Sequence, residues 1–510
     1  MKKSLLFMLL LCTLGLSVRA NNLSITNVNM VGNTVNFVLS WDNSWNSTNN
    51  VDTLYPNNWD AVWVFVKVQS DATNLWSHLP LASSGHSVSG GSTPLTIEGQ
   101  PDTVGVFIRR TNPGHGNISN ANVTLNLGTF PSGTNFNIRV FGIEMVYVPS
   151  GNYYIGDGNA STGGTYFNQT LITPTTTLSA SALFTGSPAI PATFPMAQNS
   201  FYAMKYEITQ EQFADFLNTL TYDQQANFFV VAPNSPRETY VFGSATGGAG
   251  NSSRAFIRID TSGINNTKPA VVGVNYDNID PFNDLTDGLN VAQSNLSTER
   301  FLAYLDWAGL RPMTEIEYEK ICRGTRLNGN PVASVLNEYA WGTTDIQTYT
   351  FNTFSDKNKP NERYVGTVVN GRTIAHHTTL ATFVGMVPSR VGVFAEGSTG
   401  RAASGAGFYG NMDLTGNVYE IVVGANPNGV TFTSQLGDGN LDINGWANQP
   451  TWPDPSSAGA YGLRGGGYNN PNTTGASAWN IVTRVSNRAN IGTTGVYTGN
   501  PVNTGGRGVR

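Results

Sequence analysis

The sequence predicts a β-rich protein in two parts: an all-β region, then a longer α+β region with few helices and long ordered loops. Three observations support this prediction. Apolar and polar residues alternate in short runs over residues 21–140, as in half-buried strands. Helix-capping signals such as Thr209 and Thr314 appear after residue 143. The Gly/Asn-rich stretches among them are too long for simple connections, so packing, a metal or a function should order them.

The composition excludes several classes of protein. Charged residues make up 12% of the 510 residues, about half of the usual share of about 25%. A nucleic-acid-binding protein needs a basic footprint, and a coiled coil needs abundant charged helix formers. The 10 Trp, 20 Tyr and 25 Phe argue against disorder. The profile is typical of a loop-rich exported β protein.

Residues 1–20 form a predicted signal peptide. Lys2 and Lys3 precede an apolar segment, and Val18-Arg19-Ala20 is an acceptable cleavage site. A lipoprotein signal at Cys12 is the weaker alternative, because Leu11 stands where a small residue is expected. No later apolar run reaches eighteen residues, so we expect no transmembrane segment. The predicted localisation is exported: secreted, periplasmic or at the cell surface.

The mature chain keeps one cysteine, Cys322, because Cys12 lies in the signal peptide. A single cysteine excludes an intramolecular disulfide and any mechanism that needs a thiol pair. We expect Cys322 to be a small buried hydrophobic residue.

Residues 21–140 are predicted to form a β-sandwich. Val35, Phe37, Leu39 and Trp41 alternate with polar or smaller residues. The uninterrupted apolar run 62–66 is typical of a strand buried on both faces. Further strands are expected over 104–108, 123–127 and 136–140, separated by turn clusters at 89–92 and 112–114.

Residues 143–510 are predicted to form the second domain. Thr209 and Gln212 form a capping box before one helix, and Thr314 and Glu317 form another. Ser297 is expected to cap a helix that presents an apolar face between them. Strands and long loops surround these helices.

This second part resembles the formylglycine-generating enzyme, or sulfatase-modifying factor, family, whose fold is a variant of the C-type lectin fold. The resemblance rests on seven segments in the family's order. They are 145–156, 201–209, 308–319 (AGLRPMTEIEYE), 339–342 (YAWG), 409–420 (YGNMDLTGNVYE), 464–468 (RGGGY) and 506–510.

The resemblance implies that the family's chemistry is missing. The family enzymes oxidise a sulfatase cysteine with two active-site cysteines that bind copper(I), and soft copper(I) selects thiolates. By position, these cysteines correspond to about Asn480 and Val485, which supply no thiolate. We therefore expect no copper and no enzyme activity of this kind.

The resemblance also implies a calcium site in the Gly-Asn-Val-x-Glu turn. Its ligands would be the carbonyl oxygens of Thr415, Gly416 and Val418 and the carboxylate of Glu420. An all-oxygen ligand set suits a hard cation. The alternative is that Asn417 and Glu420 bond loop amides without a metal.

Other polar clusters are expected to be structural. Glu315, Glu317 and Glu319 cannot share one helix face, so Glu317 should complete the cap while its neighbours meet arginine or water. His376 and His377 are adjacent and point apart, without a third ligand nearby. Three arginines should hold loop carbonyls or carboxylates: Arg464, Arg484 and Arg488.

The predicted function is that of a non-catalytic binding or assembly protein. Trp479, Asn480 and Tyr497 lie in the Asn/Thr/Gly-rich segment 469–503, which by the resemblance corresponds to the family's substrate groove. Aromatic faces beside amides and hydroxyls suit a glycan or protein ligand, or self-assembly into a surface structure. Ordinary loops with buried aromatics are the alternative for this segment. A family enzyme with altered chemistry and an accessory partner of a formylglycine-generating enzyme are the alternative functions.

Overall fold

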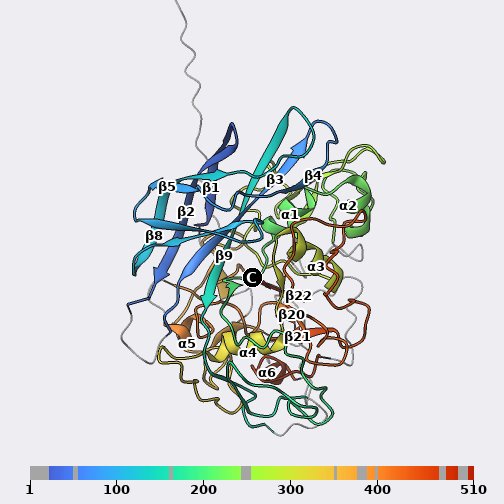
Figure 1. Ribbon diagram of the computed structural model, residues 1–510. Helices are drawn as coiled ribbons and strands as arrows, with labels where there is room; N and C mark the ends of the chain where they lie inside the picture. Colours follow the sequence, from blue (N-terminus) through green and yellow to red (C-terminus); the bar gives the residue numbers. More distant parts are fainter. Residues whose placement is uncertain are drawn as a thin grey trace, which may run out of the picture.

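A computed structural model describes residues 22–49, 56–159, 165–242, 254–349, 353–375, 387–396, 400–469, 478–491 and 503–510. Within these residues the chain is mostly sheet with few helices (Figure 1). None of the helices in these ranges is long and apolar enough to cross a membrane. The predicted signal peptide lies outside the described residues.

The N-terminal region contributes nine strands to two sheets. Their bounds are β1 Ser24–Val31, β2 Thr34–Asn46, β3 Asp60–Ser70, β4 Trp76–Leu79, β5 Ser87–Gly90, β6 Leu95–Gly99, β7 Val106–Arg110, β8 Gly114–Asn126 and β9 Phe136–Val148. One sheet has the order β1-β2-β8-β5. The other has eight strands, in the order β15-β23-β12-β9-β3-β7-β6 with β4 beside β3. Three of these come from the second region: β12 (Phe201–Met204), β15 (Arg311–Pro312) and β23 (Gly508–Val509).

Strand β3 separates two hydrophobic cores. Its even-numbered residues, among them Val62 and Val64, pack with β2 and β8 in the cluster between the two sheets. Its odd-numbered residues, among them Trp63 and Phe65, belong to the large cluster of the second part. Alternate side chains of a strand point to opposite faces, so a strand between two cores is apolar throughout. The prediction of a strand buried on both faces is therefore confirmed.

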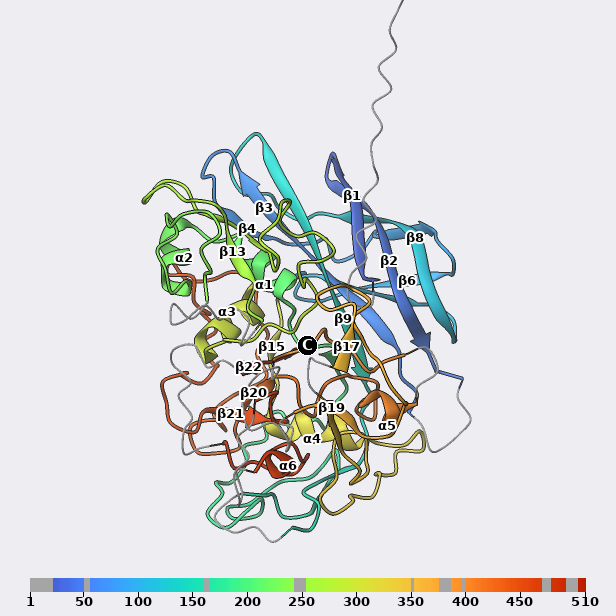
Figure 2. The ribbon, with the colours of Figure 1, turned by 180° about the vertical axis from the view of Figure 1, so that it is seen from behind.

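Strand β9 joins the two parts of the chain. It pairs antiparallel with β3 from Asp60↔Val146 to Ser70↔Phe136. Its last residues pair with β12 (Phe201–Met204), and β12 pairs with β23 (Gly508–Val509). The predicted interval between domains, at residues 140–143, lies inside this strand. One sheet thus runs through both regions (Figure 2).

The three predicted helices are confirmed with their caps. Thr209 caps α1 (Gln210–Leu217), Ser297 caps α3 (Thr298–Trp307) and Thr314 caps α4 (Glu315–Arg323), with both predicted capping boxes present. Helix α2 (Tyr222–Phe228) was not predicted, although Thr221 and Gln224 form a third box. The short helices are α5 (Arg401–Ser404) and α6 (Trp479–Val482).

The remaining strands are short. Their bounds are β10 Tyr153–Ile155, β11 Thr170–Ile172, β13 Ile257–Thr261, β14 Val271–Val274, β15 Arg311–Pro312, β16 Gln347–Tyr349, β17 Phe354–Ser355, β18 Arg363–Tyr364, β19 Arg372–Ile374, β20 Tyr419–Val423, β21 Tyr461–Arg464 and β22 Thr504–Gly505. Strand β20 lies between β21 and β22 in a three-stranded sheet.

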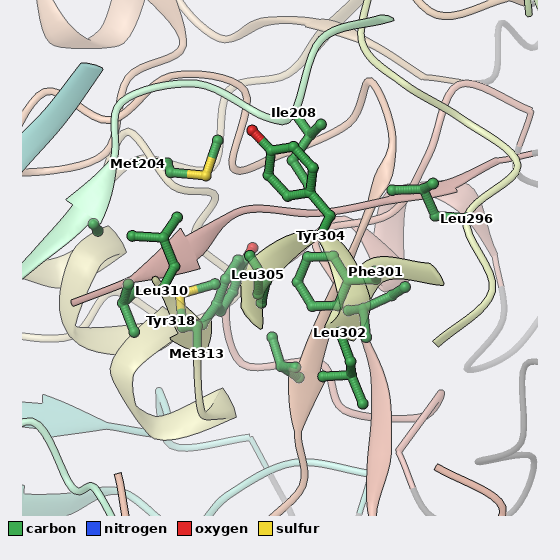
Figure 3. Close-up of a cluster of buried hydrophobic side chains, with 14 of the residues drawn as sticks. Met204, Ile208, Leu296, Phe301, Leu302, Tyr304, Leu305, Leu310, Met313 and Tyr318 are labelled. Carbon is green, nitrogen blue, oxygen red and sulfur yellow. The ribbon is translucent and has the colours of Figure 1, made fainter. Parts of the chain in front are cut away.

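The large core lies around α3 and α4 (Figure 3). Phe301, Tyr304 and Leu305 of α3 are at most 1% exposed. The N-terminal sheet is bonded to the end of this helix. Trp63 Nε1 donates to the Ala308 carbonyl at 2.8 Å, and Lys67 Nζ donates to the Trp307 carbonyl at 2.7 Å. Buried polar groups that pair across the two regions fix their relative position.

Candidate functional site

The loop before β20 is a tight turn against β19. Gly416 and Asn417 both have left-handed backbone conformations, with φ of +86° and +60°. A Cβ at Gly416 would lie 2.1 Å from Thr373 Oγ1 and 2.4 Å from the Ile374 carbonyl oxygen. Glycine therefore meets both a conformational and a steric requirement here.

Glu207 holds this turn from the segment that leads into α1. Its Oε1 accepts from the Val418 amide at 3.0 Å, and its Oε2 accepts from Asn417 Nδ2. The Oδ1 of Asn417 accepts from the Ser389 amide at 2.9 Å. Asn417 is thus bonded within the protein, as the metal-free alternative expected, but its partners lie outside the turn.

Glu420 meets an arginine from the end of the chain. Arg507 Nε donates to Glu420 Oε1 at 2.7 Å, and both side chains are completely buried. The guanidinium also donates to three carbonyl oxygens, those of Met204, Lys205 and Met412. The positive charge of Arg507 is therefore balanced by one carboxylate, and its N–H groups donate to that carboxylate and to three carbonyl oxygens.

The site holds more negative than positive groups. Burial raises the pKa of Glu207 well above its ordinary value, and the nearby Asp413 and Glu420 raise it further. Burial also raises the pKa of Asp413 to about 6, although Arg507 and Arg390 act in the opposite direction. The pKa of Glu420 is raised by burial, against the effect of Arg507. Burial of several carboxylates beside few cations has this result.

The predicted calcium ligands fit a metal in one respect. Glu420 Oε2 is buried and has no hydrogen-bond partner. The Thr415 carbonyl already accepts from Thr373 Oγ1. In the parts of the chain that are described, no three His, Cys, Asp or Glu side chains are grouped to hold a metal. A cation here would therefore depend on Glu420 Oε2 and main-chain oxygens, which is a hard-cation ligand set.

The carboxylates of α4 belong to an ion-pair network. Arg464 Nη1 lies 3.0 Å from Glu315 Oε2, and its Nη2 lies 2.5 Å from Glu319 Oε1. Arg488 Nη2 is 2.8 Å from Glu315 Oε1. Glu317 completes the cap through the Thr314 amide and also pairs with Arg311 at 2.6 Å. Each carboxylate is engaged in holding the fold.

The three predicted ligand-binding residues are placed unequally. Trp479 and Asn480 begin α6 and are half-buried. The Asn480 carbonyl accepts from the Tyr339 hydroxyl at 3.0 Å, and the Tyr339 ring stacks on Trp341. Tyr497, like His376 and His377, lies outside the described residues.

The two positions mapped to the family's cysteines differ in exposure: Asn480 is half-buried and Val485 is completely buried. The Val485 carbonyl accepts from Arg464 Nη2 at 2.6 Å. Cys322 lies in α4, is 1% exposed, and burial raises the pKa of its thiol to about 12. A protonated, buried thiol is neither a nucleophile nor a metal ligand.

Sequence reasoning missed Glu207 and Arg507 as partners of the turn. Both stood in segments that carry the resemblance, but they are 213 and 87 residues from Glu420 in the chain. No local spacing signals such a pairing. Only the packing of β12, β20 and the chain end brings them together.

Residues 139–493 match the family model described as the sulfatase-modifying factor enzyme 1-like domain. The match begins inside β9, the strand shared by both regions. A comparison with curated proteins returned no match.

Proposed function

Since the chain belongs to the sulfatase-modifying factor family, we propose that it is an exported, non-catalytic binding or assembly protein built on that family's scaffold. The observation that carries the proposal is the chemistry of the mapped catalytic positions. Asn480 and the buried Val485 provide no thiolate, and Cys322 is buried with a raised pKa. A scaffold can keep its groove after losing its reaction, because fold and chemistry are separable.

The proposed binding surface is centred on α6. Trp479, the first residue of α6, is half-buried, so part of this residue is accessible to solvent. The main chain of α6 is held by Tyr339 through the Asn480 carbonyl. A large aromatic on a fixed backbone gives contact area at small entropic cost. The proposed ligand is a glycan, another protein or a second copy of this chain.

Trp479→Ala tests this surface. If Trp479 is an exposed anchor, we expect the variant's free energy of unfolding to stay within about 0.5 kcal/mol of the wild-type value. We also expect a loss of ligand affinity of about 2 kcal/mol or more, roughly thirtyfold. Binding is measured on a glycan array and self-association by sedimentation. Loss of about 3–5 kcal/mol of stability would instead assign Trp479 to the core. Unchanged melting and unchanged binding would refute the location.

We also propose that calcium stabilises the turn before β20. The carbonyls of Thr415, Gly416 and Val418 would hold the ion together with Glu420, whose Oε2 is without a partner. The role is structural, because an ion held by main-chain oxygens fixes the turn's conformation. In this proposal, the N-terminal β-sandwich carries the calcium-stabilised domain.

A chelator tests whether calcium stabilises the turn before β20. An ion at a hundredfold excess over its Kd stabilises the folded state by about 2.7 kcal/mol. We expect a chelator to lower the melting temperature of the mature chain, and added calcium to restore it. Glu420→Gln, which keeps an acceptor for Arg507 but removes the charge, should abolish this response. If chelator and variant both leave melting unaltered, hydrogen bonds alone hold the turn.

A further inference from the structure

Strand β9 keeps part of one edge open. Its residues 136–146 pair with β3 on one side, but on the other side β12 pairs only with residues 145–148. The Lys205 amide donates to the Glu144 carbonyl at 2.9 Å, and no strand of the described residues pairs with β9 on this side before Met145. The first part of β9 is therefore an edge strand, although it lies between the two parts of the molecule (Figures 1 and 2).

The ladder shows which main-chain groups face this open edge. The Tyr147 amide donates to the Trp59 carbonyl at 2.9 Å, which is on the β3 side. In an antiparallel ladder, alternate residues turn their N–H and C=O groups to the same side. The even-numbered residues of β9 therefore face the open edge, and three of them are Ile138, Val140 and Gly142. Throughout the described part of the chain, no hydrogen bond occupies their N–H and C=O groups on this edge.

A cavity of about 290 Å³ runs along the same edge. All the residues from Ile138 to Glu144 line it, odd and even alike. Because β3 occupies the opposite edge of β9, a hollow that contacts both faces of this strand must follow the open edge. Ile138, Val140 and Gly142 are each partly exposed, so the edge can be reached. The segment 138–144 is about 20 Å long at the usual rise of a strand.

The cavity has an apolar wall on each face of β9. Leu23, Ile25 and Val28 of β1 line it on one face, where Leu23 and Ile25 pack with Ile138 and Val140. Tyr304 and Trp307 of α3 line it on the other face. There the Trp307 ring lies 4.9 Å from the ring of Phe141. A strand added to this edge would point alternate side chains at the two walls, so both sets should be apolar, as in β3.

The charged groups of the lining interact within the protein. Glu144 pairs with Lys205 at 3.2 Å, and Glu211 and Asp215 of α1 also have interactions of their own. The guanidinium of Arg139 lies 4.7 Å from the centre of a tryptophan ring of β4. The lining therefore favours an uncharged occupant. Main-chain donors and acceptors that recur at every second residue match another strand, whereas an acyl chain would pair with none of them.

We propose that the open edge of β9 binds an extended, uncharged apolar segment of another protein, about five residues long, by strand addition. The main chain of this segment pairs with Ile138, Val140 and Gly142. Its side chains alternate between the β1 wall and the α3 wall. The added strand occupies the same edge as β12 and continues it. The proposal does not depend on the α6 surface, so either can fail without the other.

Peptide selection and hydrogen exchange test this edge. Random linear heptapeptides displayed on phage are selected against the mature chain, and we expect Val, Ile, Leu or Phe at both odd and even positions. A selected synthetic peptide at tenfold its Kd should slow exchange of the Ile138, Val140 and Gly142 amides about tenfold. The Phe141 amide faces β3 and should exchange slowly with or without peptide. Failure to select any peptide, or unchanged exchange of these three amides, would overturn the proposal.

Two N-methylated forms of the selected peptide separate strand addition from other binding. Each form carries methyl groups on alternate amides, so only one form loses the N–H groups that face β9. That form should bind at least about thirtyfold more weakly, because several main-chain hydrogen bonds are lost. The other form should bind nearly as tightly as the unmodified peptide. An equal loss for both forms, or no loss for either, would contradict strand addition.

Two substitutions in β1 test the wall. Val28→Asp places a charge on the apolar lining and should weaken peptide binding about tenfold. Val28 is 40% exposed, so melting should change little. Val31→Asp is the matched control, because Val31 lies on the same strand, is 58% exposed and does not line the cavity. Equal peptide binding by both variants would refute the location.

Two other occupants would give different results. Decanoate that binds to the wild-type chain, when no peptide does, would assign the cavity to an acyl chain. Self-association of the wild type that slows the exchange of the same three amides, and that Val28→Asp alone abolishes, would assign it to a second copy. Either result would overturn the proposal of a separate protein partner.

Discussion

Arg464→Ala is expected to lower the free energy of unfolding by about 3–5 kcal/mol, because it leaves buried carboxylates without their shared cation. Arg464, Glu315 and Glu319 are all completely buried. Burial alone would raise the pKa of Glu315, but Arg488 and Arg464 bring it below its ordinary value. Removing Arg464 takes away one of the two cations that lower the pKa of Glu315, so this pKa should rise. Urea unfolding of the mature chain measures the change.

Arg363→Ala is the matched control for this prediction. The Arg363 side chain is 63% exposed and lies 3.9 Å from Asp356. Exposed ion pairs contribute about 0–1 kcal/mol, so this variant should melt close to wild type. If both arginine variants lose equally little, the network around α4 does not hold the second part together.

Arg507→Ala is also expected to lower the free energy of unfolding by about 3–5 kcal/mol, but through a different group of buried side chains. In the calcium-free protein, the variant leaves Glu420 buried beside Glu207 and Asp413 with no bonded cation. The folded-state pKa of Glu420 then rises further above its unfolded value. The folded state therefore keeps this proton up to a higher pH than the unfolded state does. Stability is therefore lost as pH rises, and the deficit should be larger at about pH 8 than at about pH 5.

A double-mutant cycle separates this pairing from general damage. Glu420→Gln in the Arg507→Ala background removes the uncompensated charge, so part of the stability should return. We expect a coupling energy in the upper part of the usual range of about 0.5–3 kcal/mol for contacting residues. Additive losses would show that Arg507 acts through its three carbonyl partners instead.

Local signals in the sequence were sufficient for the helices of the core. Thr209, Ser297 and Thr314 cap the helices they were predicted to cap, because an N-cap bond or a capping box involves only four consecutive residues. Thr221 and Gln224 have the same four-residue spacing and form a box at the start of α2, the helix that was not predicted. The two-faced burial of β3 also followed from its uninterrupted apolar run.

The end of the first region could not be located from the sequence in the same way. The prediction treated residues 140–143 as a division between domains, because helix signals appear among strands and long loops from about residue 143. No proline or turn cluster interrupts Phe136–Val148, and the structure has one strand there. The pairing of β9 with both β3 and β12 depends on residues about 80 positions before it and 55 after it. Such pairing leaves no local trace.

The polar sites show the same limit. The turn before β20 was recognised from its residues, but its partners Glu207 and Arg507 were not. Their convergence is a property of the packed structure and has no motif.

We propose that this chain keeps the scaffold of the sulfatase-modifying factor family without the family's oxidation of a cysteine. The direct measurement is co-expression of the protein with a sulfatase-motif peptide, followed by mass spectrometry of the peptide's cysteine. We predict that the cysteine stays unmodified with wild type and with Cys322→Ser. Formylglycine that forms only when this protein is present would contradict the claim.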